Sequence, residues 1–148
     1  MILHAGLVAL RRGGLWRGVL IEGPSGAGKS DLAMRCLESG FRLVADDRVI
    51  VWASGGAVYG RAPDTIAGLI EARGIGVARL TPLPLCQIAL RLRLADAGQA
   101  IERLPPPAVS PLLEVQLPVI SLCGLEASAP LKLIQAIERL GAGAQQEY

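Results

Sequence analysis

The residues 23–30, GPSGAGKS, have the types and the spacing that bind the phosphates of a nucleotide. A glycine, four further residues and then Gly-Lys-Ser satisfy the phosphate-loop pattern in full. In such a loop the backbone N–H groups point at phosphate oxygens, the lysine reaches the phosphate that is transferred, and the serine hydroxyl ligates Mg²⁺. The alternative is a glycine-rich turn without a ligand. The predicted nucleotide-binding residues are Gly23, Pro24, Ser25, Gly26, Ala27, Gly28, Lys29 and Ser30.

A pair of carboxylates, Asp46 and Asp47, follows the apolar segment 41–45. Where parallel strands run from the core to a crevice, their carboxyl ends meet beside the bound ligand. Adjacent strand residues point to opposite faces, so one carboxylate can face a metal while the other accepts a proton from an incoming hydroxyl. An ordinary acidic turn is the alternative, and the phosphate loop that precedes the pair favours the catalytic interpretation.

Other charged residues are ordinary when each is taken alone. Glu71 and Arg73 are typical of a solvated helix face, and Arg103 is typical of a surface charge before a proline-rich segment. A single histidine near a terminus, such as His4, is more often a surface residue than a catalyst.

The elements that must position these residues follow from the hydrophobic pattern. We expect strands over 6–10 and 17–22 on either side of a turn, a short helix from Ser30 that stops at Gly40, and a strand over 41–47. A hairpin is predicted around residues 54–56. Because proline suits a first helical turn, a second helix is predicted from Pro63 to Gly74.

The rest of the chain predicts strands over 75–80 and 85–95, a stiff extended connector over 103–111 and an amphipathic helix over 129–141. The expected fold is therefore an α/β single P-loop kinase-like domain, with a mixed sheet flanked by helices, over residues 1–140. Residues 141–148 are expected to form a polar C-terminal tail.

Composition excludes several classes of function. The net charge is +2 and the basic residues are scattered, so no nucleic-acid partner is expected. No apolar run approaches the ~18 residues of a membrane span, so neither a membrane helix nor a signal peptide is expected. The three cysteines form no CxxC pair, which fits a reducing cytoplasm.

Several segments together resemble the catalytic domain of HPr kinase/phosphorylase, the bacterial family that phosphorylates a serine of the phosphocarrier protein HPr. LVADD and E-x-RGIG are the most specific matches. In family order, over about the first half of the chain, the resembling segments are LHAGLVAL, GPSGAGKSDLA, SGFRLVADDRV, GRAP and IEARGIGV.

The resemblance implies roles for individual residues. His4 would be an active-site histidine, and Ser30 and Glu71 would be magnesium ligands. Lys29 would be the phosphate-loop lysine. The Asp46-Asp47 pair would be the acid/base centre, with Asp47 favoured as the base.

The resemblance extends less clearly to Arg103, which stands where the family places an arginine after a strand of alternating Arg and Leu. The family segment with an Arg-Pro-Gly-Arg core, tied to the reverse, dephosphorylating reaction, has no counterpart in residues 117–130. Arg79 or Arg91 would then have to supply that cation through the fold. The chain also begins almost at His4, so it resembles the short form found in some Gram-negative bacteria.

These features predict an ATP- and Mg²⁺-dependent serine kinase that acts on an HPr-like phosphocarrier protein, with weak or absent reverse activity. The resemblance further implies a homo-oligomer, and the cysteine pattern a cytoplasmic location. Two alternatives are a small-molecule P-loop kinase and a regulatory module that binds ATP without turnover. The E-x-RGIG segment argues against the first, and the presence of a candidate proton acceptor argues against the second.

Overall fold

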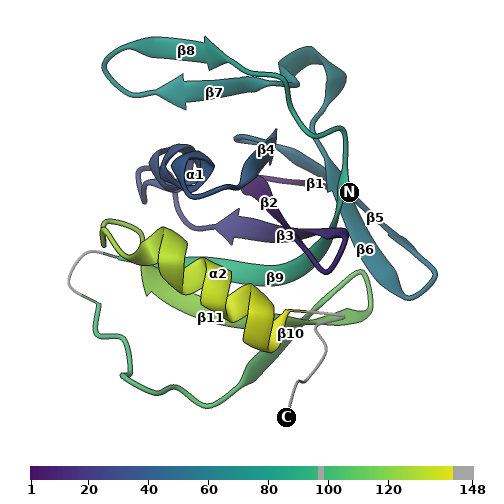
Figure 1. Ribbon diagram of the computed structural model, residues 1–148, viewed down its shortest axis with the longest axis vertical. Helices are drawn as coiled ribbons and strands as arrows, with labels where there is room; N and C mark the ends of the chain where they lie inside the picture. Colours follow the sequence, from purple (N-terminus) through teal and green to yellow (C-terminus); the bar gives the residue numbers. More distant parts are fainter. Residues whose placement is uncertain (97–98, 142–148) are drawn as a thin grey trace.

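The computed structural model describes residues 1–96 and 99–141 (Figure 1). In this part of the chain, nine strands form one mixed sheet and two further strands form a separate hairpin. The strands of the large sheet are β1 (Ile2–Leu3), β2 (Gly6–Arg12), β3 (Leu15–Glu22), β4 (Arg42–Ala45), β5 (Val49–Ser54), β6 (Ala57–Arg61), β9 (Cys86–Ala95), β10 (Ala108–Leu112) and β11 (Val115–Cys123). The separate hairpin is β7 (Leu69–Ala72) and β8 (Gly76–Arg79), and the helices are α1 (Lys29–Glu38) and α2 (Ala129–Leu140). The predicted α/β class with a mixed sheet is confirmed.

The order and direction of the strands bring several strand ends to one edge of the sheet. Strands β1, β5, β6, β9, β3, β2 and β4 lie side by side in that order, and β11 pairs with β9 and β10. Strand β9 is parallel to β3 and to β11, whereas β2 is antiparallel to both of its neighbours, β3 and β4. The carboxyl ends of β3, β4, β9 and β11 and the amino end of β2 therefore share one edge, which we call the carboxyl edge.

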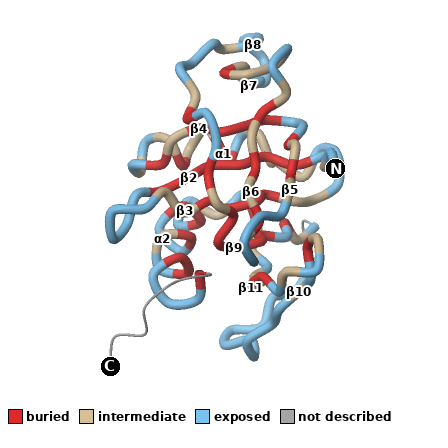
Figure 2. The backbone as a smooth tube through the Cα atoms, turned by 90° about the vertical axis from the view of Figure 1, so that its right-hand side faces the viewer, coloured by how far each residue is buried: buried red, intermediate tan, exposed pale blue. Residues whose placement is uncertain are grey.

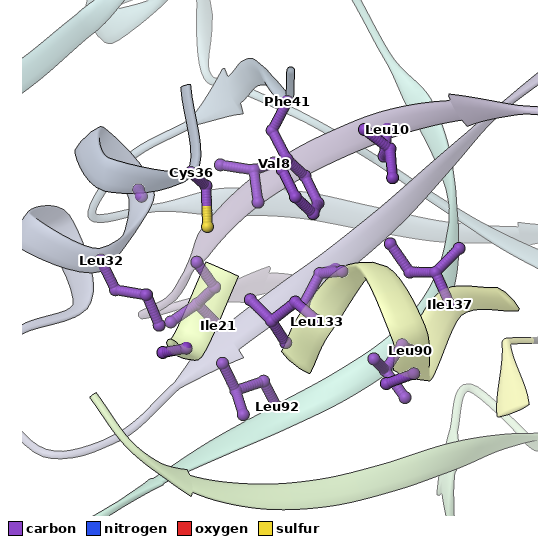
Figure 3. Packing of buried hydrophobic residues seen from close by; sticks show 14 of the residues in the cluster. Val8, Leu10, Ile21, Leu32, Cys36, Phe41, Leu90, Leu92, Leu133 and Ile137 are labelled. Atoms are coloured by element: carbon purple, nitrogen blue, oxygen red, sulfur yellow. The ribbon is translucent and has the colours of Figure 1, made fainter. Parts of the chain in front are cut away.

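Both helices pack on the same face of this sheet. Leu32 of α1 and Leu133 of α2 are fully buried, and Figure 3 shows them converging on Ile21 of β3. The opposite face is covered by strands: Leu20 of β3 belongs to a second buried cluster that includes Leu117 of β11. Figure 2 shows the central strands as the most continuously buried part of the molecule. The strand that leads into the phosphate loop is thus held from both sides.

The prediction of a helix over residues 63–74 is wrong. The structure has a short 3₁₀ turn over Asp64–Ile66 and then strand β7. Gly68 has a φ of 80°, and a Cβ there would lie 2.2 Å from the carbonyl oxygen of Leu80. A left-handed residue pressed against another backbone segment cannot continue a right-handed helix, so the chain turns and pairs with β8. Glu71 therefore lies on a strand and not in the last turn of a helix.

The other predicted elements are mostly confirmed. The hairpin at residues 54–56 joins β5 to β6, and the predicted helices at 30–39 and 129–141 correspond to α1 and α2. The connector predicted over 103–111 is only partly right, because its second half is β10. Strand β11 was not predicted. Residues 142–148 of the expected polar tail lie outside the described residues.

None of the described helices combines the length and the apolar character that crossing a membrane requires.

Candidate active site

The phosphate loop joins β3 to α1 at the carboxyl edge. Gly26 and Gly28 have φ angles of 82° and 93°, and no atom lies within 4 Å of a Cβ built on either one. The backbone conformation, rather than crowding, is what requires glycine at these positions. Gly28 caps α1 without a side-chain hydrogen bond, so no capping side chain would compete with an anion for the first N–H groups of the helix.

Lys29 curls back over the loop. Its Nζ donates hydrogen bonds to the carbonyl oxygens of Gly23 at 2.7 Å and Pro24 at 3.0 Å. A phosphate oxygen carries a negative charge and therefore attracts the ammonium group more strongly than a neutral carbonyl oxygen does. A phosphate oxygen bound in the loop can therefore compete with these neutral acceptors for the ammonium group.

Asp46 is buried against the phosphate-loop serine. The Ser30 hydroxyl lies 2.8 Å from Oδ1 and 3.0 Å from Oδ2 of this carboxylate and donates to it, and the Asp46 residue is only 6% exposed. The backbone N–H of Glu71 donates to the same Oδ2 at 3.3 Å. A loop hydroxyl next to a strand-end carboxylate is the pair that holds Mg²⁺ in phosphate-loop NTPases.

Asp47 has different surroundings. Its side chain is 70% exposed and lies 3.8 Å from Nε of Arg48. Its backbone is left-handed, with a φ of 68°, a conformation that aspartate tolerates better than most residues. Its carbonyl oxygen accepts the N–H of Ala5 at 3.2 Å. This bond joins the start of β2 to the end of β4.

The other predicted site residues, His4, Glu71 and Arg103, are all exposed and differ in the contacts that they make. His4 is exposed immediately before Ala5, and so lies next to the Asp47 backbone contact. Glu71 has an exposed side chain on β7, and the contact that it makes with Asp46 uses its backbone. Arg103 is exposed in the segment between β9 and β10, and within the described residues no hydrogen bond or ion pair joins it to the phosphate loop.

The donors at this edge fit a magnesium ion that is shared with a nucleotide. The described residues contain no cluster of three or more His, Cys, Asp or Glu side chains that could hold a metal by themselves. Mg²⁺ usually takes one or two protein ligands and completes its shell with phosphate oxygens and water. Ser30 and Asp46 match that requirement.

Sequence reasoning missed Glu22 and did not foresee what Arg91 contacts. Arg91 is 9% exposed in the middle of β9, and its guanidinium binds both carboxylate oxygens of Glu22, at 2.7 and 2.8 Å. The hydrogen bond to Glu22 raises the pKa of Arg91, and burial opposes that rise. The available signal was an arginine at a buried position of an apolar strand, because such a charge needs a partner.

Comparison with known proteins places these features in a family. The family model described as the HPr Serine kinase C-terminal domain matches residues 3–83, which is more than half of the chain. The match includes His4, the phosphate loop, both aspartates and Glu71, and it ends before Arg103.

Curated relatives match over shorter stretches. The HPr kinase/phosphorylase of Clostridium botulinum (strain Eklund 17B / Type B) is 42% identical over 66 residues, which are 45% of this chain and 22% of that protein. The one from Mycoplasmopsis pulmonis is 37% identical over 89 residues, 55% of this chain and 29% of that protein. The chain thus spans less than a third of the length of these relatives.

One solved structure is similar over nearly its whole length. The HPr(Ser) kinase/phosphatase from Coxiella burnetii superposes with a TM-score of 0.77 over 93% of this chain and 94% of that one, at 22% identity. At this level of identity the likeness shows the fold. Together with the matched phosphate loop and aspartate pair, the family model establishes that the chain belongs to the HPr serine kinase family, through its C-terminal domain.

Proposed function

We propose that this protein transfers the γ-phosphoryl group of ATP to a serine hydroxyl of an HPr-like phosphocarrier protein, and that it works mainly in this direction. The observation that carries the proposal is the contact between Ser30 and the buried Asp46 at the mouth of a complete phosphate loop. That pair offers a hydroxyl and a carboxylate to a magnesium ion beside the β- and γ-phosphates.

The chain's own residues divide the work of phosphoryl transfer. The loop N–H groups bind and orient the triphosphate, and Lys29 stabilises the charge that develops on the transferred group. Ser30 and Asp46 would hold Mg²⁺, which would neutralise phosphate charge. Asp47 accepts the serine proton while the serine oxygen bonds to the γ-phosphorus and the bond from that phosphorus to the ADP oxygen breaks.

The exposure of Asp47 supports a protein substrate. A base that is 70% exposed is open to a serine presented on the surface of another molecule. His4 lies beside it, and Glu71 and Arg103 are the further residues that we assign to the site. In this assignment the Glu71 carboxylate is a further magnesium ligand, and the contact of its N–H group with Asp46 is what brings the residue to the site.

The surroundings of the basic residues support a weak reverse reaction. Dephosphorylation by phosphate requires two anions to be held side by side, which needs well-placed cations. Arg91 is bound to Glu22, and Lys132, the first basic residue after the segment 117–130, forms an ion pair with Glu126. Neither of these two groups is free to offset the repulsion, so of the two arginines considered above only the exposed Arg79 could supply the cation.

The test is an assay with labelled ATP and the HPr-like proteins of the host, followed by mapping of the modified residue. We expect label on one serine, and none with Lys29→Ala. Arg12→Met is the matched control, because it removes a charge from an exposed ion pair with Glu138 at the edge of the sheet opposite the loop. Transfer to small molecules alone would indicate a small-molecule kinase, and binding without transfer would indicate an ATP sensor; either result would contradict the proposal.

The family resemblance also supports a homo-oligomer in the cytoplasm. Sedimentation velocity at several protein concentrations tests the assembly directly. A species with the mass of one chain at all concentrations would contradict this part of the proposal.

A further inference from the structure

We infer that Glu22 and Arg91 form a positioning pair that sets the geometry of the phosphate loop. The inference rests on the proposed function and extends it to residues that the phosphate-loop pattern does not include. Neither residue touches the reacting atoms in this assignment, and both act through the loop.

The pair is tightly and directionally bonded. Nε and Nη2 of Arg91 donate to the two carboxylate oxygens of Glu22, and the side chains are 10% and 22% exposed. The remaining donor, Nη1, reaches Oγ of Ser110 at 3.2 Å and the carbonyl oxygen of Pro111 at 3.0 Å. One guanidinium therefore joins β9, the end of β3 and strand β10.

The bonded carboxylate is next to the loop in the chain. Glu22 is the last residue of β3, and Gly23 follows it directly. A Cβ built on Gly23 would lie 3.2 Å from Cβ of Leu94, so the start of the loop is packed closely against β9. The Gly23 carbonyl oxygen in turn accepts the Lys29 ammonium group. A short chain of contacts thus runs from Arg91 through Glu22 and Gly23 to Lys29.

The same guanidinium also holds β10, the strand that follows Arg103 in the chain. Its contacts are with Ser110 and Pro111, inside that strand. Arg93, two residues further along β9, donates to the Ser110 hydroxyl as well. Arg91 therefore holds β10 as well as the end of β3.

A buried ion pair is a weak source of stability, because the cost of removing two charges from water offsets their attraction. Well-packed apolar residues of similar volume often stabilise a fold equally well. Four directional bonds instead restrict orientation, and catalysis is sensitive to displacements of about 1 Å. The contribution of the pair is therefore expected in nucleotide binding and turnover more than in the unfolding temperature.

The experiment compares Arg91→Lys, the double variant Glu22→Leu/Arg91→Met and the control Arg12→Met in the full chain. For each, we would measure the melting temperature, the Kd of a fluorescent MgATP analogue, and kcat and KM for phosphoryl transfer. Lysine keeps the positive charge but cannot make the bidentate contact with Glu22. The double variant removes both charges. We expect both to stay folded with a raised Kd, and kcat to fall on the order of ten- to a hundred-fold.

Several outcomes would overturn the inference. A folded double variant with the Kd and kcat of the wild type would do so. So would Arg91→Lys losing stability and activity in parallel while the double variant regains both, because the pair would then serve only the fold. If the wild type binds the analogue but transfers no phosphoryl group, the proposed function fails, and a raised Kd in the variants still supports the pair. A wild type that binds no nucleotide would overturn both.

Discussion

The two aspartates at the end of β4 differ in burial although they are neighbours in sequence. Asp46 is held by Ser30 and by the N–H of Glu71, whereas Asp47 is exposed beside Arg48. A buried carboxylate that already accepts hydrogen bonds from a hydroxyl and an N–H group is poorly placed to take a proton from a substrate. The exposed carboxylate is free to do so, which is the basis for assigning the base to Asp47.

Substitution of each aspartate by asparagine is expected to give distinct defects. Asp47→Asn should keep MgATP binding and lower kcat on the order of 10²–10⁴-fold, because an amide cannot accept the serine proton. Asp46→Asn should instead raise the Mg²⁺ concentration needed for half-maximal activity, since a neutral oxygen is a weaker ligand for a hard cation. Magnesium titrations of both variants provide the measurement. The reverse pattern would exchange the two assignments.

The buried thiols make stability depend on alkaline pH. Burial raises the pKa of Cys36 and of Cys86 from 9.0 to about 12. The unfolded chain releases these protons at a lower pH than the folded chain, so the contribution to stability is complete below pH 9 and is lost as the pH rises toward 12. Urea unfolding of wild type and Cys86→Ala at several pH values above and below 9 tests this. The wild type should lose more stability on alkalinisation than the variant, and equal slopes would contradict the prediction.

At the scale of elements, the hairpin β7–β8 depends on one glycine. Gly68 has a φ of 80°, and its carbonyl oxygen accepts the N–H of Leu80 at 2.7 Å. Gly68→Ala should destabilise the fold on the order of 1–3 kcal/mol, because it adds a clash with Leu80 to an unfavourable φ. Gly74→Ala, at a φ of 87° in open space, is the matched control and should have the smaller effect. Urea unfolding measures both, and equal effects would show that the clash is relieved.

The same hairpin shows where prediction from sequence reached its limit. The phosphate loop, α1 and β4 were predictable because local signals coincide there: a glycine pattern, an apolar helix face and a strand that ends in acidic residues. Segment 63–74 carries a proline start and helical spacing, and the left-handed backbone of Gly68 pressed against Leu80 excludes the helix. That contact joins residues whose pairing the local sequence does not encode.

Long-range pairing also explains what was missed in the site. The bond between Glu22 and Arg91 depends on the parallel register of β3 and β9. Neither residue belongs to a recognisable pattern, so sequence alone suggested at most that a buried arginine needs a partner. The contact of Ser30 with Asp46, in contrast, joins two segments that were each identified, and only their distance had to come from the structure.

For the molecule as a whole, the direction of the reaction is the property to test. Purified serine-phosphorylated partner, presented with about millimolar phosphate and no ATP, should release little pyrophosphate. The reason is that carboxylates bind both Arg91 and Lys132, so neither of these two cations is free to offset the repulsion between two anions. Pyrophosphate release as fast as the forward reaction would refute this expectation.

The position of β9 beside β3 has a consequence for how the protein folds. Strand β3, which leads into the phosphate loop, lies between β2 and β9. Residues 15–22 must therefore pair with residues 86–95 in parallel register before the start of the loop is held in place. Pairings between such distant segments form late and slow the overall rate. MgATP would bind only after this step, so it should slow unfolding and leave the refolding rate nearly unchanged. Stopped-flow refolding and unfolding with and without MgATP would measure both rates. Nucleotide that accelerated refolding would mean instead that the loop closes around phosphate before the sheet is complete.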